Sequence, residues 1–154
     1  MNVRQVVQKQ YQRVADHGVV PDRAPPPPEG WLRTMRKALG MSGAQLARRM
    51  GVTRARVAQA EASEGEGGIT LKSMEAMADA MGCRFVYAVV PDEGRIEDVI
   101  LAQARRKATT MVNAASTHMA LESQTLPDNR IADEIERLTR ELARDMPADF
   151  WNDA

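Results

Sequence analysis

The sequence has few of the residues that build metal sites, disulfides and aromatic cores. Its 154 residues include one cysteine, Cys83, two histidines and 4% aromatics, which excludes an internal disulfide and a thiolate-rich zinc site. No apolar run approaches the roughly 18 residues that span a bilayer, and the first residues lack the apolar core of a signal peptide. We therefore expect a cytoplasmic protein with no membrane partner, no bound metal and no cofactor.

Sequence motifs for catalysis are also missing. The glycines at 65, 67 and 68 precede Ile69-Thr70 without the lysine that a phosphate-binding loop requires. No Ser–His–Asp or Cys–His set emerges from the spacing, and Cys83 opens an apolar segment, where cysteine is more often a small buried residue than a nucleophile. The sequence predicts that the protein is not an enzyme.

The sequence has many charged residues of both signs, but the two signs are segregated along the chain. The chain has 21 Lys plus Arg and 21 Asp plus Glu, and a net charge of zero by itself argues against a nucleic-acid partner. Residues 1–61, however, carry a net charge of +7, residues 62–94 carry −4, and residues 95–154 carry −3. This segregation predicts two surfaces, a basic one suited to DNA and an acidic one suited to a protein partner.

Turn and helix-breaking residues divide the chain into four parts. Residues 1–28 are predicted to form an N-terminal helix and a stiff spacer with four consecutive prolines. Residues 29–82 contain the pattern of four short helices that end at glycines, with a flexible acidic loop at 64–68. Residues 83–94 are predicted to be a strand and turn, and residues 95–154 a C-terminal helical region for dimer or partner contacts. The predicted fold class is mainly α.

The single predicted strand presents a physical problem. Residues 83–90 are rich in β-branched and aromatic residues and are followed by Pro91. Backbone N–H and C=O groups of a lone strand need a partner, so we infer pairing with the same strand of another copy or with a partner protein. The residues predicted to form this dimerisation contact are Phe85, Val86, Tyr87, Ala88 and Val89.

A helix-turn-helix pattern occupies residues 42–61. Ser42 is a predicted N-cap with Gln45 in the capping-box position, Gly51 forms the turn, and Thr53 caps the second helix. The second helix exposes side chains that can read base edges or contact phosphates: Arg54, Arg56 and Gln59. Helical hairpins with a glycine turn are common, and many do not bind DNA. The basic charge of this half of the chain favours the DNA-binding interpretation.

Residues 31–82 resemble the phage-repressor and Cro type of helix-turn-helix domain, the XRE family. The matching residues are Gln45-Leu46-Ala47, Gly51-Val52-Thr53, Val57 and Glu61. The resemblance implies a lambda-repressor-like fold in which the helix at 53–63 enters the major groove. Arg54, Ala55 and Gln59 would then face the bases, with Arg56 at the edge of that face. Gly43 departs from the family, which often has a Gln there to anchor the recognition helix.

Two further sets of residues are predicted around this motif. By the same resemblance, Arg36 and Glu61 form a partly buried ion pair that orients the recognition helix, with a solvated Glu61 as the alternative. Amides at the N-terminus of a helix bind phosphate, so the segment that begins at Ser42 is a predicted backbone contact. The other predicted phosphate contacts are Arg33, Lys37, Arg49, Thr53, Thr70 and Lys72, for each of which a solvated side chain is the alternative.

The whole chain also resembles a narrower group, the mobile mystery protein A family. The segments that match are Pro-Pro-Glu-Gly-Trp-Leu-Arg at 27–33, Lys-Ala-Leu-Gly-Met-Ser at 37–42, Val-Tyr-Ala-Val-Val-Pro at 86–91, Gln-Ala-Arg-Arg-Lys-Ala at 103–108, His-Met-Ala-Leu-Glu at 118–122 and Phe-Trp at 150–151. The resemblance implies a gene beside one for a Fic-domain protein, in an arrangement like a toxin–antitoxin pair. No Ser or Thr here is followed by Glu at the fourth position, so the Ser/Thr-x-x-x-Glu inhibitory motif for Fic proteins is missing.

These observations predict a sequence-specific repressor of the XRE type. It would bind double-stranded DNA as a homodimer on a pseudo-palindromic operator and act as the antitoxin-like autoregulator of an operon with a Fic-domain toxin. The alternative is a protein-binding antitoxin or adaptor that neutralises its partner through the acidic C-terminal half.

Overall fold

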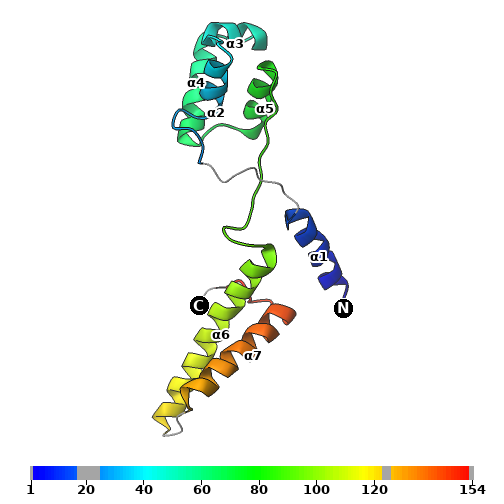
Figure 1. Cartoon of the computed structure of the whole chain (residues 1–154), viewed down its shortest axis with the longest axis vertical. Helices are drawn as coiled ribbons and strands as arrows, with labels where there is room; N and C mark the ends of the chain where they lie inside the picture. Colours follow the sequence, from blue (N-terminus) through cyan, green and yellow to red (C-terminus); the bar gives the residue numbers. More distant parts are fainter. Residues whose placement is uncertain (1, 17–24, 123–125, 153–154) are drawn as a thin grey trace. The chain divides into compact units, whose positions relative to one another are not determined.

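The computed structural model describes residues 2–16, 25–122 and 126–152, and these residues form seven helices (Figure 1). The helices are α1 Val3–Asp16, α2 Trp31–Ala38, α3 Gly43–Met50, α4 Arg54–Glu66, α5 Leu71–Ala80, α6 Ile96–Leu121 and α7 Asp128–Asp145. The mainly α fold class is confirmed. Not one of these helices is both long and apolar enough to cross a membrane.

The chain divides into two compact units. One unit comprises residues 20–88 and contains α2 to α5, and the other comprises residues 1–19 and 89–154 and contains α1, α6 and α7. The N-terminal helix therefore belongs with the C-terminal helices, although four helices separate them in sequence. The boundary near residue 88 falls inside the segment predicted as a strand. We call the two parts the 20–88 unit and the α1/α6/α7 unit.

The core of the 20–88 unit is built from aliphatic and methionine side chains. Its buried members are Leu32, Leu46, Ala47, Val57, Met74, Met77 and Met81. Methionine is unbranched and polarisable, so it fills irregular gaps between short helices without aromatic rings. The helices of this unit are only 8 to 13 residues long, and helices so short are marginal in isolation. Packing around this core therefore provides most of their stability.

The core of the α1/α6/α7 unit lies between the two long helices, which run side by side (Figure 1). Ala104 and Ala108 on α6 are fully buried, and their small side chains let α7 approach closely. Phe150, from the tail beyond α7, is also buried in this core. Gln103 Nε2 donates a hydrogen bond of 2.8 Å to the Phe150 carbonyl, which holds the tail against α6.

The predicted strand at 83–90 is absent. Residues 83–90 have no regular secondary structure, and the described part of the chain contains no strand. The prediction of a strand was wrong for the single chain because a strand requires a ladder partner, and β-propensity cannot supply one. Phe85 and Tyr87 nevertheless stack with ring centroids 5.5 Å apart, so alternate side chains of this segment lie on one side.

The predicted flexible loop at 64–68 is largely helical. Helix α4 continues to Glu66, and its C-cap is Gly67 in the left-handed conformation with φ 75°. Glu64 lies in the last full turn, where its carboxylate is engaged by the backbone of α2. A contact between residues 33 positions apart in sequence stabilises this turn, and the local glycine content could not reveal it.

Candidate DNA-binding site

The helix-turn-helix is formed by α3, a tight turn and α4. Ser42 Oγ accepts a hydrogen bond from the Gln45 amide at 3.1 Å, and Gln45 Oε1 accepts one from the Ser42 amide at 2.8 Å, so both halves of a capping box are present. Gly51 adopts the left-handed conformation with φ 67°. Residues with a Cβ adopt that conformation at a cost, so glycine suits a sharp turn between two helices.

Helix α4 begins with its own N-cap, and its buried side packs against α3. Thr53 Oγ1 accepts a hydrogen bond of 3.1 Å from the Arg56 amide, and this contact sets the first turn of the helix. Val57 of α4 is buried beside Leu46 and Ala47 of α3. Because Ala47 has a small side chain, α4 docks close to α3. The other residues from Arg54 to Gln59 therefore point away from the core.

The four residues predicted to read bases lie on this outward side. Arg54, Ala55, Arg56 and Gln59 are all exposed on the first two turns of α4. Arg56 Nη1 lies 3.4 Å from Gln59 Oε1, a long hydrogen bond that DNA could easily replace. A bidentate Arg–guanine contact and an amide–adenine contact need a rigid helix that presents such groups together. The exposed side of α4 meets this requirement.

A three-residue ion cluster connects α2 to the middle of α4. Arg36 Nε and Nη2 donate to the two carboxylate oxygens of Glu61 at 2.5 and 3.0 Å, and Arg33 Nε donates to Glu61 Oε2 at 3.1 Å. The Glu61 side chain is 3% exposed and that of Arg36 is 14% exposed. Arg36 Nη1 also donates to the Met41 carbonyl at 3.0 Å. The structure thus brings the predicted pair together and adds Arg33, which had been assigned to phosphate.

The ion cluster changes the acidity of its members. Burial alone would raise the pKa of the Glu61 carboxyl, but hydrogen bonds from Arg36 and Arg33 outweigh burial and hold this pKa below its usual value. The hydrogen bond to Glu61 raises the pKa of Arg36. Glu61 and Arg36 are therefore both charged at neutral pH, and each of these two buried charges has a partner.

The predicted phosphate contacts fall into three groups. Ser42, Thr53 and Thr70 are the N-caps of α3, α4 and α5. Lys37 Nζ pairs with Glu29 at 2.9 Å, and Arg49 Nε donates to the Ala80 carbonyl at 2.5 Å. Lys72 is exposed in the first turn of α5. Phosphate binding by Lys37, Arg49 or Arg33 would therefore compete with a contact inside the protein.

Sequence reasoning missed the role of Glu64. Its carboxylate accepts hydrogen bonds from the amides of Trp31 at 2.6 Å and Leu32 at 2.9 Å, so it caps the N-terminus of α2 from the far end of α4. Gly30, the N-cap residue, has no side chain to do so and adopts φ 82°. A Cβ at Gly30 would lie 2.8 Å from Glu64 Oε2. The only signal in the sequence was a glycine at a helix start, where Ser, Thr or Asp is usual.

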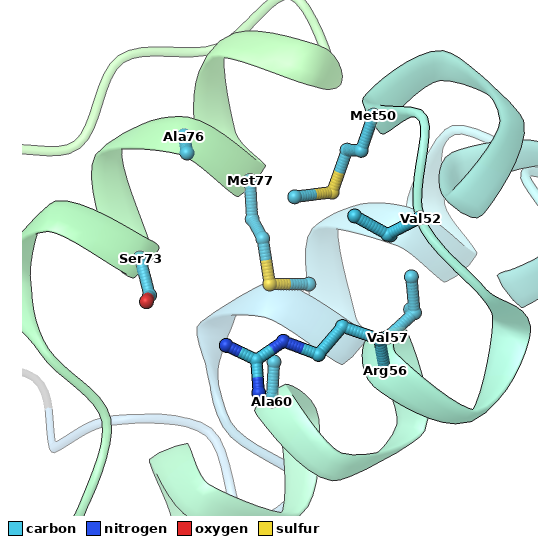
Figure 2. Close-up of a pocket in the computed structure, with 8 residues that line it drawn as sticks. All are labelled: Met50, Val52, Arg56, Val57, Ala60, Ser73, Ala76 and Met77. Atoms are coloured by element: carbon cyan, nitrogen blue, oxygen red, sulfur yellow. The ribbon is translucent and has the colours of Figure 1, made fainter.

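A small pocket lies beside the exposed side of α4 (Figure 2). Its volume is about 170 Å³, and it is lined by Met50, Val52, Arg56, Val57, Ala60, Ser73, Ala76 and Met77. In Figure 2 the side chain of Arg56 reaches along the pocket, with its guanidinium in front of Ala60. Arg56 therefore lines an apolar pocket and is also exposed to solvent, as is usual for an arginine whose stem lies along apolar surface.

The predicted dimerisation residues occupy the end of the 20–88 unit and the start of the following segment. Phe85 packs partly against the core of that unit, whereas Val86 and Tyr87 are about two-thirds exposed. Val89 is 92% exposed. An uncharged run with this much apolar surface is a ready template for pairing with another chain.

One family comparison matches this part of the chain. Residues 32–87 match the helix-turn-helix family model HTH_3. Neither the curated proteins nor the solved structures contain a match to the chain. With the capped α3–α4 pair and the core described above, residues 32–87 form a helix-turn-helix domain of the lambda-repressor, XRE type, a class of domain that binds DNA in regulators of transcription. The match does not extend to the α1/α6/α7 unit.

Proposed function

We propose that this protein is a sequence-specific transcriptional repressor that acts as a dimer on a pseudo-palindromic operator near its own gene. The single observation that supports this most strongly is the first two turns of α4, where Arg54, Arg56 and Gln59 stand exposed on a helix held by caps and the Glu61 ion cluster. Arg54 is the proposed guanine reader and Gln59 the adenine reader.

The dimer in this proposal follows from the apolar run at 86–89. These residues of one copy would pair with those of a second copy, which would cover surface that the single chain leaves in water. Two recognition helices would then reach successive major grooves about 34 Å apart, and the operator would have matching two-fold symmetry.

The experiment is footprinting on the DNA upstream of the gene. The wild-type chain is expected to protect two half-sites, and Arg54→Ala is expected to weaken protection by roughly 5- to 150-fold, because a bidentate arginine–guanine contact contributes about 1–3 kcal/mol. Arg140→Ala is the matched control, since it removes an exposed arginine from α7. Protection by Arg54→Ala equal to that by Arg140→Ala would rule out the recognition-helix assignment.

The proposal includes an antitoxin-like role beside a Fic-domain protein, which the resemblance to the mobile mystery protein A family supports. Restraint of a Fic protein by this chain would not use the Ser/Thr-x-x-x-Glu motif, because the sequence lacks it. Co-expression of the two proteins, followed by copurification and a growth assay, tests this part. A Fic protein that neither binds the chain nor changes growth in its presence would remove the antitoxin role and leave repression intact.

The alternative, partner neutralisation through the acidic C-terminal half, has less support. Several carboxylates of this unit pair with its own cations: Glu134 and Glu141 with Arg137, Glu136 with Arg105, Asp145 with Arg144, and Asp149 with Lys107. These pairs neutralise part of the negative charge that such a partner would recognise.

A further inference from the structure

Helix α1 is amphipathic, but its apolar side faces solvent. Four apolar side chains, Val3, Val6, Val7 and Tyr11, follow one another at helical spacing and share one side of the helix. Val3 and Tyr11 are 79% and 74% exposed, and Val6 and Val7 are 44% exposed. We call these four residues the α1 stripe. A surface helix normally turns such a stripe toward its own core.

The side of α1 that meets its own unit is polar instead. Gln5 Nε2 donates to the Arg144 carbonyl at 3.3 Å, and Gln8 Nε2 donates to Met146 Sδ at 2.9 Å. At the other end, Asp16 Oδ1 accepts a hydrogen bond from the Ile96 amide at 3.1 Å. Hydrogen bonds along the polar side thus hold α1 on its unit and leave the α1 stripe in water. An apolar face in that position is stabilised when another surface covers it.

We propose that the α1 stripe packs against the same stripe of a second copy, with the two helices antiparallel about a two-fold axis beside Val7. This inference rests on the proposed function in one respect, because that function requires a dimer. Val3 and Tyr11 lie four residues to either side of Val7, so the axis places Val3 of each copy opposite Tyr11 of the other. The pairing is isologous, as in most homodimers.

The charges beside the α1 stripe suit this register. Arg4 lies on the same flank of the helix as Tyr11, and a two-fold axis brings equal flanks together. Arg4 of each copy therefore falls next to the ring of Tyr11 of the other copy, where a cation–π contact is favourable. A parallel two-fold pairing would instead place equal flanks on opposite sides of the seam, so Arg4 of one copy would not meet Tyr11 of the other.

The small size of the α1 stripe also favours a second copy over a separate protein. Four side chains cover far less than the roughly 800 Å² per partner of a stable interface, so this surface could not recruit an independent protein by itself. In a dimer already joined through residues 86–89, the two helices meet at a high effective concentration, and a small contact suffices. The α1 stripe is therefore a second contact of the proposed dimer.

Disulfide trapping in the full-length chain tests the pairing. In a Cys83→Ser background, which removes the one native thiol, Val7→Cys places a thiol beside the proposed axis. Lys9→Cys is the matched control, because Lys9 is exposed on the same helix but lies off the stripe. At low micromolar concentration, mild oxidation is expected to link most Val7→Cys chains into dimers, and at least tenfold fewer Lys9→Cys chains.

A second variant uses no cysteine chemistry. Val7→Asp places two carboxylates at the axis and is expected to weaken dimerisation by at least tenfold in sedimentation experiments, whereas Lys9→Asp leaves it nearly unchanged. A chain that sediments as a dimer, yet forms no Val7→Cys disulfide and tolerates Val7→Asp, would overturn the inference and leave the proposed repressor in place. Efficient trapping in a chain that binds no operator would support the inference and refute the proposed function.

Discussion

The two units of this protein use their charges in different ways. In the 20–88 unit, two glutamates hold helices together: Glu61 is buried between two arginines, and Glu64 caps α2 from α4. The arginines at the start of α4 remain on the surface. In the α1/α6/α7 unit, most ion pairs are exposed and join neighbours, such as Arg137 with Glu134 and Glu141. Charged groups thus orient helices in the 20–88 unit, whereas in the α1/α6/α7 unit most of them form exposed ion pairs on the surface.

The largest effect is expected from removal of the buried carboxylate. Glu61→Ala leaves Arg36 buried without its partner, so the free energy of unfolding should fall by about 3–5 kcal/mol. Glu134→Ala in α7 is the matched control, because it removes a carboxylate from an exposed arginine pair. Urea denaturation measures both, and the control should stay close to wild type. An equal fall in the free energy of unfolding of Glu61→Ala and Glu134→Ala would mean that the buried ion cluster stabilises its unit no more than an exposed ion pair does.

Acid should weaken the same cluster, by less than Glu61→Ala does, because a protonated carboxyl still forms hydrogen bonds. The folded-state pKa of Glu61 lies below its ordinary value of 4.5, so the cluster stabilises the fold fully above that value and progressively less as the pH falls through the lowered pKa. Denaturation curves between pH 7 and pH 3 measure the loss. Glu61→Gln, which cannot titrate, should show a shallower decline, and an identical pH profile would contradict the assignment.

A smaller effect is expected at the cap of α2. Glu64→Ala leaves the Trp31 and Leu32 amides without their carboxylate, and loss of an N-cap costs about 1 kcal/mol. Glu66→Ala, two residues further on and exposed, serves as the control. Thermal unfolding compares them. Gly30→Ala should be more disruptive than Glu66→Ala, since its Cβ would meet the Glu64 carboxylate at a positive φ.

The smallest effect concerns salt. Each phosphate that a cation neutralises adds about 0.9 to the slope of log affinity against log salt, so Lys72→Ala should lower that slope by about 0.9 and weaken all DNA sequences equally. Lys107→Ala, in the α1/α6/α7 unit, pairs with Asp149 and should leave the slope unchanged. Fluorescence anisotropy at several salt concentrations measures both. A slope that Lys72→Ala does not alter would remove Lys72 from the DNA contacts.

The local features of the fold were predictable where the physics is local. Ser42 with Gln45, and Thr53, were predicted as caps, and each N-cap side chain accepts a hydrogen bond from the backbone amide three residues ahead. The predictions for 64–68 and 83–90 were wrong for opposite reasons. Glu64 gains a partner from α2 that local composition does not show, whereas residues 83–90 lack the strand partner that their composition favours.

The candidate site shows the same division. The exposure of Arg54, Arg56 and Gln59 followed from the helical period, because Val57 marks the buried side of α4. The engagement of Arg33 with Glu61 did not, since a surface arginine and a buried one look alike in sequence. The sequence also could not show that α1 contacts its unit through its polar side, because periodicity identifies an apolar stripe but not whether the stripe faces the core or solvent.

By itself, the sequence determined the mainly helical fold, the N-caps Ser42 and Thr53 and the helix-turn-helix, because these depend on residues three or four positions apart. Only the tertiary structure decided that Glu64 caps α2, that Arg33 joins the Glu61 cluster, and that α1 docks by its polar side. Those outcomes depend on which distant groups meet. A carboxylate takes whichever donors the packed helices bring within about 3 Å, and no sequence spacing encodes that distance.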